Sequence, residues 1–429
     1  MNEKANKNFS YIMYALGYLG ISIFIQTTVK WYQYFYTPPG DQQQGLTILV
    51  PISLIGLAMI IARLFDGLAD PIVAYLSDKN KGKGGRRIPF ILYGSLPLAI
   101  TFILLWFPPV QQESMLNFYY LATMLCLFFI FFTIVTAPYL ALIGELSRTR
   151  KDRINLTMIM GVTQIIGVMV AEAGSGLLIS FYGYQIMGLV LGLVALLMIL
   201  LTPIFVRENP ADEAKLPTVS LFSSMRLTLT NNQFIYYLLA YGSVWFGINT
   251  LTIAMPYIYQ VLLHASAESS GIAIALAFVV ALAASPVVPR LVLKYGKKEV
   301  LFISSVFFAI ILMLTGLFGT FFTGIASMII VALAGFPLAV IFIVPNAMVA
   351  DIAEIDARSL GQQREGMFFG AQGLIIKLVV GLSSFITPLV FRLFGYSLEN
   401  PLGLQLIGPF AGVIILVNLF WLSKYSLSQ

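Results

Sequence analysis

Long apolar blocks, separated by short polar segments, run along the whole chain. Most of them reach the roughly 20 residues that a helix needs to cross a bilayer, whereas the strands of a membrane barrel are shorter and alternate in polarity. A helix satisfies its own backbone hydrogen bonds in lipid, so the pattern predicts an all-α membrane bundle. We expect twelve transmembrane helices, at 11–36, 46–76, 88–107, 115–145, 154–181, 184–206, 233–263, 267–295, 299–320, 323–353, 364–395 and 401–425.

The composition supports a membrane protein. Hydrophobic residues make up 59% of the 429 positions and charged residues 10%, against roughly 25% charged residues in soluble domains. The single cysteine, Cys126, excludes an internal disulfide framework, and the single histidine, His264, leaves no cluster for zinc or haem. We expect no enzyme, because no nucleophile, base and orienting group come together, and no cofactor beyond a coupling ion.

The basic residues predict the orientation. All lysines and arginines other than Lys30, Arg63, Lys377 and Arg392 lie in the terminal segments, in the loops after even-numbered spans or in the span ends beside these loops. The positive-inside rule therefore places both termini in the cytoplasm, with the N-terminal segment as a tail and not a cleaved signal. The net charge of +6 reflects this orientation and contact with anionic lipid, and it gives no support for nucleic-acid binding.

The chain reads as two halves. A polar linker is expected at 207–230, between six spans in 1–206 and six in 231–429. The segment DPIVAYL at 70–76 is echoed by SPVVPRL at 285–291, and each half carries a proline followed by an acid late in its fourth span. Parallel halves of this kind are typical of the major facilitator architecture, in which two six-helix bundles surround a central site.

The second span carries three charges. Arg63, Asp66 and Asp70 follow each other at i, i+3 and i+7, so a helix places them on one stripe. An ionisable group at this depth costs at least roughly 2.5–3.5 kcal/mol and must face the bundle interior. Two carboxylates one turn apart suit a hard monovalent cation or a proton, and Thr133 adds a hydroxyl. Alternatively, Arg63 neutralises one acid and the trio only joins helices.

Other charges in the spans are more ambiguous. Glu172 is either a proton or substrate contact or a protonated packing residue, and it has no neighbouring base in the sequence. Lys377 is expected to receive an anionic or hydroxylated substrate or to balance the acid pair. Lys30 lies among aromatic residues at the end of its span, where its amine is expected to snorkel to the interface, and Arg392 is placed similarly.

The seventh span offers a stacking surface. Tyr241, Trp245 and Asn249 are candidates for stacking on a sugar and hydrogen-bonding it, although aromatic residues also occur in ordinary bundle packing. The pairs Gly188-x3-Gly192 and Gly366-x3-Gly370 predict close contact between helices.

Several segments together resemble a known family. ARLFDGLADPI, SDKNKGKGGRRIPFIL, APYLALIGELSRTRKDR, MVADIAE and REGMFFGAQGLIIK are similar to the glycoside–pentoside–hexuronide:cation symporters of the major facilitator superfamily, the melibiose permease-like family. The resemblance implies that Asp66 and Asp70 bind the cation with Thr133, and that sodium, lithium and protons compete there. Ala69 stands where the family commonly has an amide.

The resemblance also concerns the substrate and the cytoplasmic face. The family's sugar contacts, four charged residues and one tryptophan, fall here on Ile21, Ser22, Thr136, Leu140 and Gly161. Lys377 alone matches, so a galactoside is not expected, and Thr136 is retained as a substrate contact. The 78–87 loop resembles the superfamily's cytoplasmic latch. The expected gate residues are Asp78, Arg86, Arg87, Glu145, Arg153, Asp351 and Arg364.

The expected function is cation-coupled uptake of a small solute, a sugar or glycoside, by alternating access. The coupling ion is sodium or a proton, and the protein is expected to be a monomer in the cell membrane. Two alternatives share the fold: an uncoupled facilitator, in which the acids only pair with Arg63, and a transporter of lysolipids or other amphiphiles. A receptor or scaffold would be expected to carry a sizeable soluble domain.

Overall fold

The computed structural model describes residues 2–39, 46–80, 85–147, 150–208, 228–360 and 365–426. Within these segments the regular structure is helical, with one isolated bridge between Phe318 and Phe322. The chain forms two compact units, which are described separately. Most of the expected linker at 207–230 lies outside the described residues.

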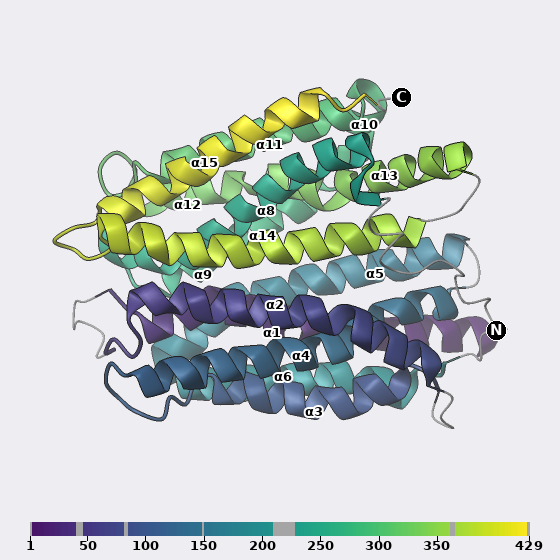
Figure 1. Ribbon diagram of the computed structural model, residues 1–429, viewed down its shortest axis with the longest axis horizontal. Helices are drawn as coiled ribbons and strands as arrows, with labels where there is room; N and C mark the ends of the chain where they lie inside the picture. Colours follow the sequence, from purple (N-terminus) through teal and green to yellow (C-terminus); the bar gives the residue numbers. More distant parts are fainter. Residues whose placement is uncertain are drawn as a thin grey trace. The chain divides into compact units, whose positions relative to one another are not determined.

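The first unit comprises Met1–Ala214 together with Glu268–Gly271. Its packing partners α3 and α4 lie side by side in Figure 1, and α1 packs against α5 and α6 while α2 packs against α4. Its helices are α1 (Asn2–Tyr36), α2 (Ile52–Lys79), α3 (Ile88–Leu104), α4 (Met115–Leu146), α5 (Arg150–Met169), the π-helical turn η2 (Val170–Gly174) and α6 (Ser175–Phe205).

The second unit comprises Lys215–Ala267 and Ile272–Gln429. In it α8 packs against α14 and α15, and α11 packs against α13 and α15. Its helices are α8 (Asn232–Tyr257), the π-helical turn η3 (Ile258–Leu262), α9 (Ser269–Ala284), α10 (Val288–Tyr295), α11 (Lys297–Thr315), α12 (Gly324–Leu333), α13 (Gly335–Leu360), α14 (Glu365–Phe394) and α15 (Leu402–Ser423). The first three residues of α9 belong to the first unit.

Side-chain caps begin two of these helices. Ser114 accepts a hydrogen bond from the backbone N–H of Leu116 at 3.1 Å and starts α4. Asn231 accepts from the N–H groups of Gln233 and Phe234 and starts α8. Both caps satisfy backbone donors that the first helical turn leaves without partners.

Nine helices of the described residues are long and apolar enough to cross a membrane, or up to ten if α9 and α10, bent by 59°, form one span. One of these stretches, Asn155–Phe205, has 51 residues. It contains Gly183 with φ 80° and ψ 175°, a non-helical conformation open to glycine, between the two spans expected there. The membrane character is therefore confirmed, whereas the count of twelve crossings stays a prediction.

The pair Gly188 and Gly192 lies where α6 meets α3. A Cβ atom added to Gly188 would lie 2.2 Å from Trp106 Cδ1, and one added to Gly192 would lie 2.7 Å from Ile103 Cγ1. The predicted close contact is confirmed here. At Gly370, no described atom lies within 4 Å of an added Cβ, so the same prediction is wrong for that glycine.

Helix α2 buries its charges and exposes its apolar residues. Asp66 and Arg63 expose 0% and 6% of their surface, whereas Leu68 exposes 64%. This distribution is the reverse of that in a soluble protein, and it fits a helix surrounded by lipid, because hydrocarbon solvates leucine and not a carboxylate.

Candidate functional site

The predicted acid pair and Thr133 lie together inside the first unit. Because α2 packs against α4, the Thr133 hydroxyl comes within 2.6 Å of Asp66 Oδ1 and 3.3 Å of Asp70 Oδ1. The side chains of Asp66 and Thr133 are fully buried. Two carboxylates and a hydroxyl thus present oxygen atoms to one point, as a hard cation requires.

Arg63 approaches Asp66 from the other side. Its Nη1 lies 3.3 Å from Asp66 Oδ2, and its guanidinium lies 4.0 Å from the centre of the Phe129 ring. Asp66 therefore uses one oxygen toward Arg63 and the other toward Thr133. Arg63 Nε is buried without a hydrogen-bond partner among the described residues. The arrangement is compatible with both alternatives raised by the sequence, an ion site and an ion pair.

Glu172 has a basic partner that sequence reasoning missed. Lys30 Nζ lies 2.9 Å from Glu172 Oε2 and donates a hydrogen bond to the Glu172 backbone oxygen, also at 2.9 Å. The expectation that Lys30 snorkels to the interface is wrong, because its side chain is fully buried. Glu172 lies on the π-helical turn η2, and the neighbouring Trp31 donates to Ser175 at 2.7 Å.

A signal for this pair was present in the sequence. Lys30 lies six residues before the outer end of its expected span, and Glu172 lies nine residues before the outer end of its own. Two opposite charges at a similar membrane depth are natural partners, because each otherwise pays the cost of burial alone.

The seventh-span candidates lie on α8 in the second unit. Asn249 donates from its amide nitrogen to the hydroxyls of Ser383 at 2.7 Å and Ser384 at 3.0 Å, and so joins α8 to α14. Tyr241 and Trp245 form an edge-to-face pair with ring centres 6.3 Å apart. The indole Nε1 of Trp245 is buried, with no hydrogen-bond partner in the described part of the chain.

Lys377 and Thr136 are both partly exposed. Lys377 lies on α14 with a partly exposed side chain. Thr136 lies on α4, one turn after Thr133, and its hydroxyl donates to the backbone oxygen of Phe132 at 2.8 Å. The oxygen of Thr136 still has acceptor capacity, because a hydroxyl carries two lone pairs.

Part of the expected cytoplasmic gate forms a cluster. Glu145 Oε1 lies 2.5 Å from Arg86 Nη2 and 3.1 Å from Arg87 Nη1, and Arg87 also donates to the Ala141 backbone oxygen. Sequence reasoning missed Glu208, which accepts from the backbone N–H groups of Arg87 and Ile88 at 2.9–3.3 Å and caps the start of α3.

The other gate residues have different outcomes. In the second unit Asp351 Oδ2 lies 2.5 Å from the Nζ of Lys297, a partner that was not expected. The side chains of Asp78 and Arg153, and the whole of Arg364, lie outside the described residues.

Comparisons with known proteins agree with this architecture. The sequence model of the MFS/sugar transport protein family matches residues 13–428. "Uncharacterized symporter YnaJ" of Bacillus subtilis is 22% identical over 89% of this chain and 82% of its own. The isoprimeverose transporter of Lactiplantibacillus pentosus is 19% identical over 81% and 74%.

Two further likenesses concern a segment and the fold. "Putative glycoside/cation symporter YagG" of Escherichia coli is 27% identical over 33% of this chain, and the match spans 29% of that protein. A crystal structure of a point mutant of the nucleoside transporter NupG has a TM-score of 0.69 at 12% identity and covers 98% of this chain and 99% of its own.

Proposed function

The chain belongs to the MFS/sugar transport protein family, and from this premise we propose that it is a symporter that couples a cation to a small sugar or glycoside. The contact of one hydroxyl, that of Thr133, with both Asp66 and Asp70 carries the proposal. Similarity over most of the chain to proteins named as a symporter and as an isoprimeverose transporter supports it.

The ion binds among three oxygen atoms: Oδ1 of Asp66, a carboxylate oxygen of Asp70 and the hydroxyl of Thr133. Arg63 keeps Oδ2 of Asp66, 3.3 Å from its Nη1, and so limits the net negative charge of the site. A cation at this point stabilises the packing of α2 against α4. Coupling follows if the packed arrangement also binds the solute more tightly, because ion and solute then share one free energy.

Each unit carries candidate solute contacts. In the second unit, Trp245 supplies an aromatic face and a spare N–H donor, Tyr241 extends that face, and Lys377 supplies a cation. Asn249 holds α14 against α8 beneath this face. In the first unit, the Thr136 oxygen accepts a hydrogen bond from a solute hydroxyl. Glu172 contributes to solute binding through its ion pair with Lys30. The ion pairs of Glu145 and Asp351 act at the cytoplasmic gate.

Transport by purified protein in liposomes tests the proposal. A panel of labelled glycosides and pentoses is offered under an inward sodium gradient, an inward proton gradient or neither. Accumulation that requires one gradient supports the proposal, and Asp70→Asn is expected to abolish this accumulation while solute exchange continues. Equal uptake with and without every gradient would rule out coupling.

The contact between Arg63 and Asp66 supports a second candidate, a facilitator without coupling. In that case the arginine already neutralises the buried acid and the site takes no ion. The liposome experiment separates the two, because a facilitator equilibrates the solute but does not concentrate it.

A further inference from the structure

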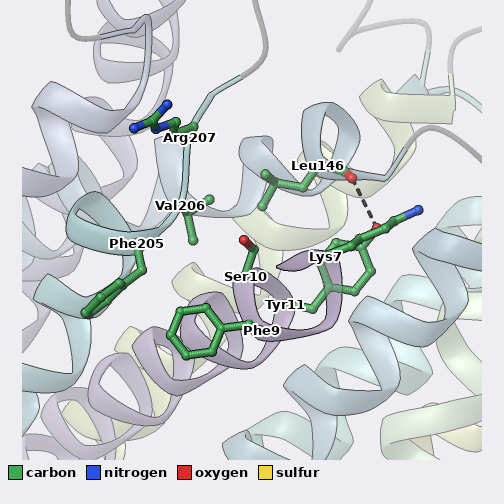
Figure 2. A pocket seen from close by; sticks show the side chains of 8 residues that line it. All are labelled: Lys7, Phe9, Ser10, Tyr11, Leu146, Phe205, Val206 and Arg207. Carbon is green, nitrogen blue, oxygen red and sulfur yellow. Dashed lines mark hydrogen bonds between the residues drawn. The ribbon is translucent and has the colours of Figure 1, made fainter. Parts of the chain in front are cut away.

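A cavity of about 380 Å³ opens at one end of the first unit, where α1 begins and where α4 and α6 end. Figure 2 shows its lining: α1 contributes Lys7, Phe9, Ser10 and Tyr11, and the end of α6 and the residues after it contribute Phe205, Val206 and Arg207. The Tyr11 hydroxyl donates to the Leu146 backbone oxygen at 3.2 Å and joins α1 to the end of α4. The same end of α4 carries Glu145, the partner of Arg86, so the cavity lies on the side predicted to face the cytoplasm.

The charged residues that line the cavity are both basic. Lys7 and Arg207 flank it on opposite sides in Figure 2, with the Ser10 hydroxyl between them. The Lys7 side chain is 44% exposed and lies 2.7 Å from Asp152, while Arg207 is exposed. An ammonium has three N–H donors, so Lys7 can hold Asp152 and an additional acceptor at once.

The apolar part of the lining is exposed at the surface of the unit. Phe9 and Phe205 pack edge to face with ring centres 5.6 Å apart, and they expose 48% and 45% of their surface. The neighbouring Ile12 and Ile204 are also exposed, at 45% and 64%. The exposed apolar surface of α1 and α6 therefore leads directly into a cavity with two cations at its rim.

We propose that this cavity binds the headgroup of an anionic glycerophospholipid from the cytoplasmic leaflet. Lys7 and Arg207 attract the anionic headgroup from opposite sides of the rim and Ser10 donates a hydrogen bond to the phosphate, while an acyl chain lies along Phe9 and Phe205. A lipid fits better than a soluble anion, because basic side chains at the membrane surface attract anionic headgroups and the apolar rings give the chain a contact surface. This inference does not depend on which solute or ion the protein carries.

Lipid binding in nanodiscs tests the proposal. Purified protein is placed in phosphatidylcholine nanodiscs with a trace of labelled phosphatidylglycerol, and the lipid retained after delipidation is measured by native mass spectrometry. Each of Lys7→Gln and Arg207→Gln is expected to weaken retention by about fivefold, the size of one surface charge interaction with anionic lipid. Lys294→Gln, at an exposed lysine of α10, is the matched control and should change nothing.

The source of the phosphate and the apolar contact are tested in parallel. Soluble glycerol phosphate at millimolar concentration should not displace the lipid, and Phe9→Ala should weaken retention with both charges intact. Displacement by glycerol phosphate would overturn the lipid assignment. Equal retention of phosphatidylcholine, or an equal loss in Lys294→Gln, would show only general surface attraction and would also overturn it. Unchanged thermal unfolding of each variant shows that the fold is kept.

Discussion

The ammonium of Lys30 and the carboxylate of Glu172 lie 2.9 Å apart, and their side chains expose 0% and 2% of their surface. The pair joins α1 to the π-helical turn that follows α5. A buried charge without a partner is far more costly than a buried pair, so each residue makes the other tolerable. Gly271 belongs to the same unit and lies directly over the pair: a Cβ atom added to it would lie 1.8 Å from the Glu172 backbone oxygen and 2.6 Å from Lys30 Nζ.

Removing one member of this pair should destabilise the protein more than removing both. Lys30→Met or Glu172→Gln alone is expected to cost about 3–5 kcal/mol, because the remaining charge stays buried, and the double variant should recover a large part of that loss. Denaturant unfolding in detergent measures the free energy of unfolding of the wild type, the two single variants and the double variant. Arg358→Gln breaks an exposed pair with Glu354 and serves as control, with an expected cost below about 1 kcal/mol. Additive losses in the double variant would mean that the two charges are not coupled.

Asp66 and Asp70 should differ when each is neutralised. Asp66→Asn leaves Arg63 buried without its acid, so we expect a loss of stability of about 3–5 kcal/mol as well as loss of ion binding. In Asp70→Asn that pair remains, and mainly ion binding should be lost. Thermal unfolding and calorimetric titration with sodium and with protons measure the two effects. If both variants unfold like the wild type, the Arg63 contact contributes nothing to stability.

The Thr133 hydroxyl should contribute to ion affinity. Thr133→Val removes an oxygen that contacts both carboxylates, and we expect the dissociation constant of the coupling ion to rise about ten- to a hundredfold, as for a lost interaction with a charged group. Thr101→Val is the control, because that buried hydroxyl bonds only to backbone oxygens of its own helix in the described contacts. Equal ion affinity in both variants would remove Thr133 from the site.

The contact of Gly188 with Trp106 should not tolerate a methyl group. Gly188→Ala places a carbon 2.2 Å from Trp106 Cδ1, and the displacement should cost about 1–3 kcal/mol. Gly370→Ala provides the comparison, because no described atom lies within 4 Å of the added carbon. Alanine there should be neutral or stabilise helix α14 by up to about 1 kcal/mol. Denaturant unfolding measures the free energy of unfolding of both variants. An unchanged value for Gly188→Ala would show that α3 and α6 can move apart.

The cluster of Glu145 with Arg86 and Arg87 should act on transport more than on ion binding. Glu145→Gln removes the acceptor that Arg86 and Arg87 share, so we expect the rate of solute exchange to change while sodium or proton affinity measured by calorimetry stays within about twofold. A tenfold change in ion affinity would mean that this cluster belongs to the ion site.

The local sequence pattern determined the membrane helices and the position of the charges on the second span. The length and apolarity of the blocks predict helices that cross a membrane, because a helix satisfies its own backbone hydrogen bonds wherever it lies. The spacing of Arg63, Asp66 and Asp70 places them on one stripe, because side chains of a helix recur every 3.6 residues. Thr133 was a candidate for a further hydroxyl ligand and the family resemblance supported it, but its contact with the acids depends on tertiary packing, because it lies on another helix.

Tertiary packing alone decided the partners of the remaining polar groups. Lys30 and Glu172 are 142 positions apart, Arg87 and Glu208 are 121 apart, and Asn249 and Ser383 are 134 apart. Helical periodicity relates residues three or four positions apart and carries no information over such separations. The packing of the helices decides which buried charges form a pair and that the Asn249 amide bonds within its own unit. Only packing brings these atoms within hydrogen-bonding distance.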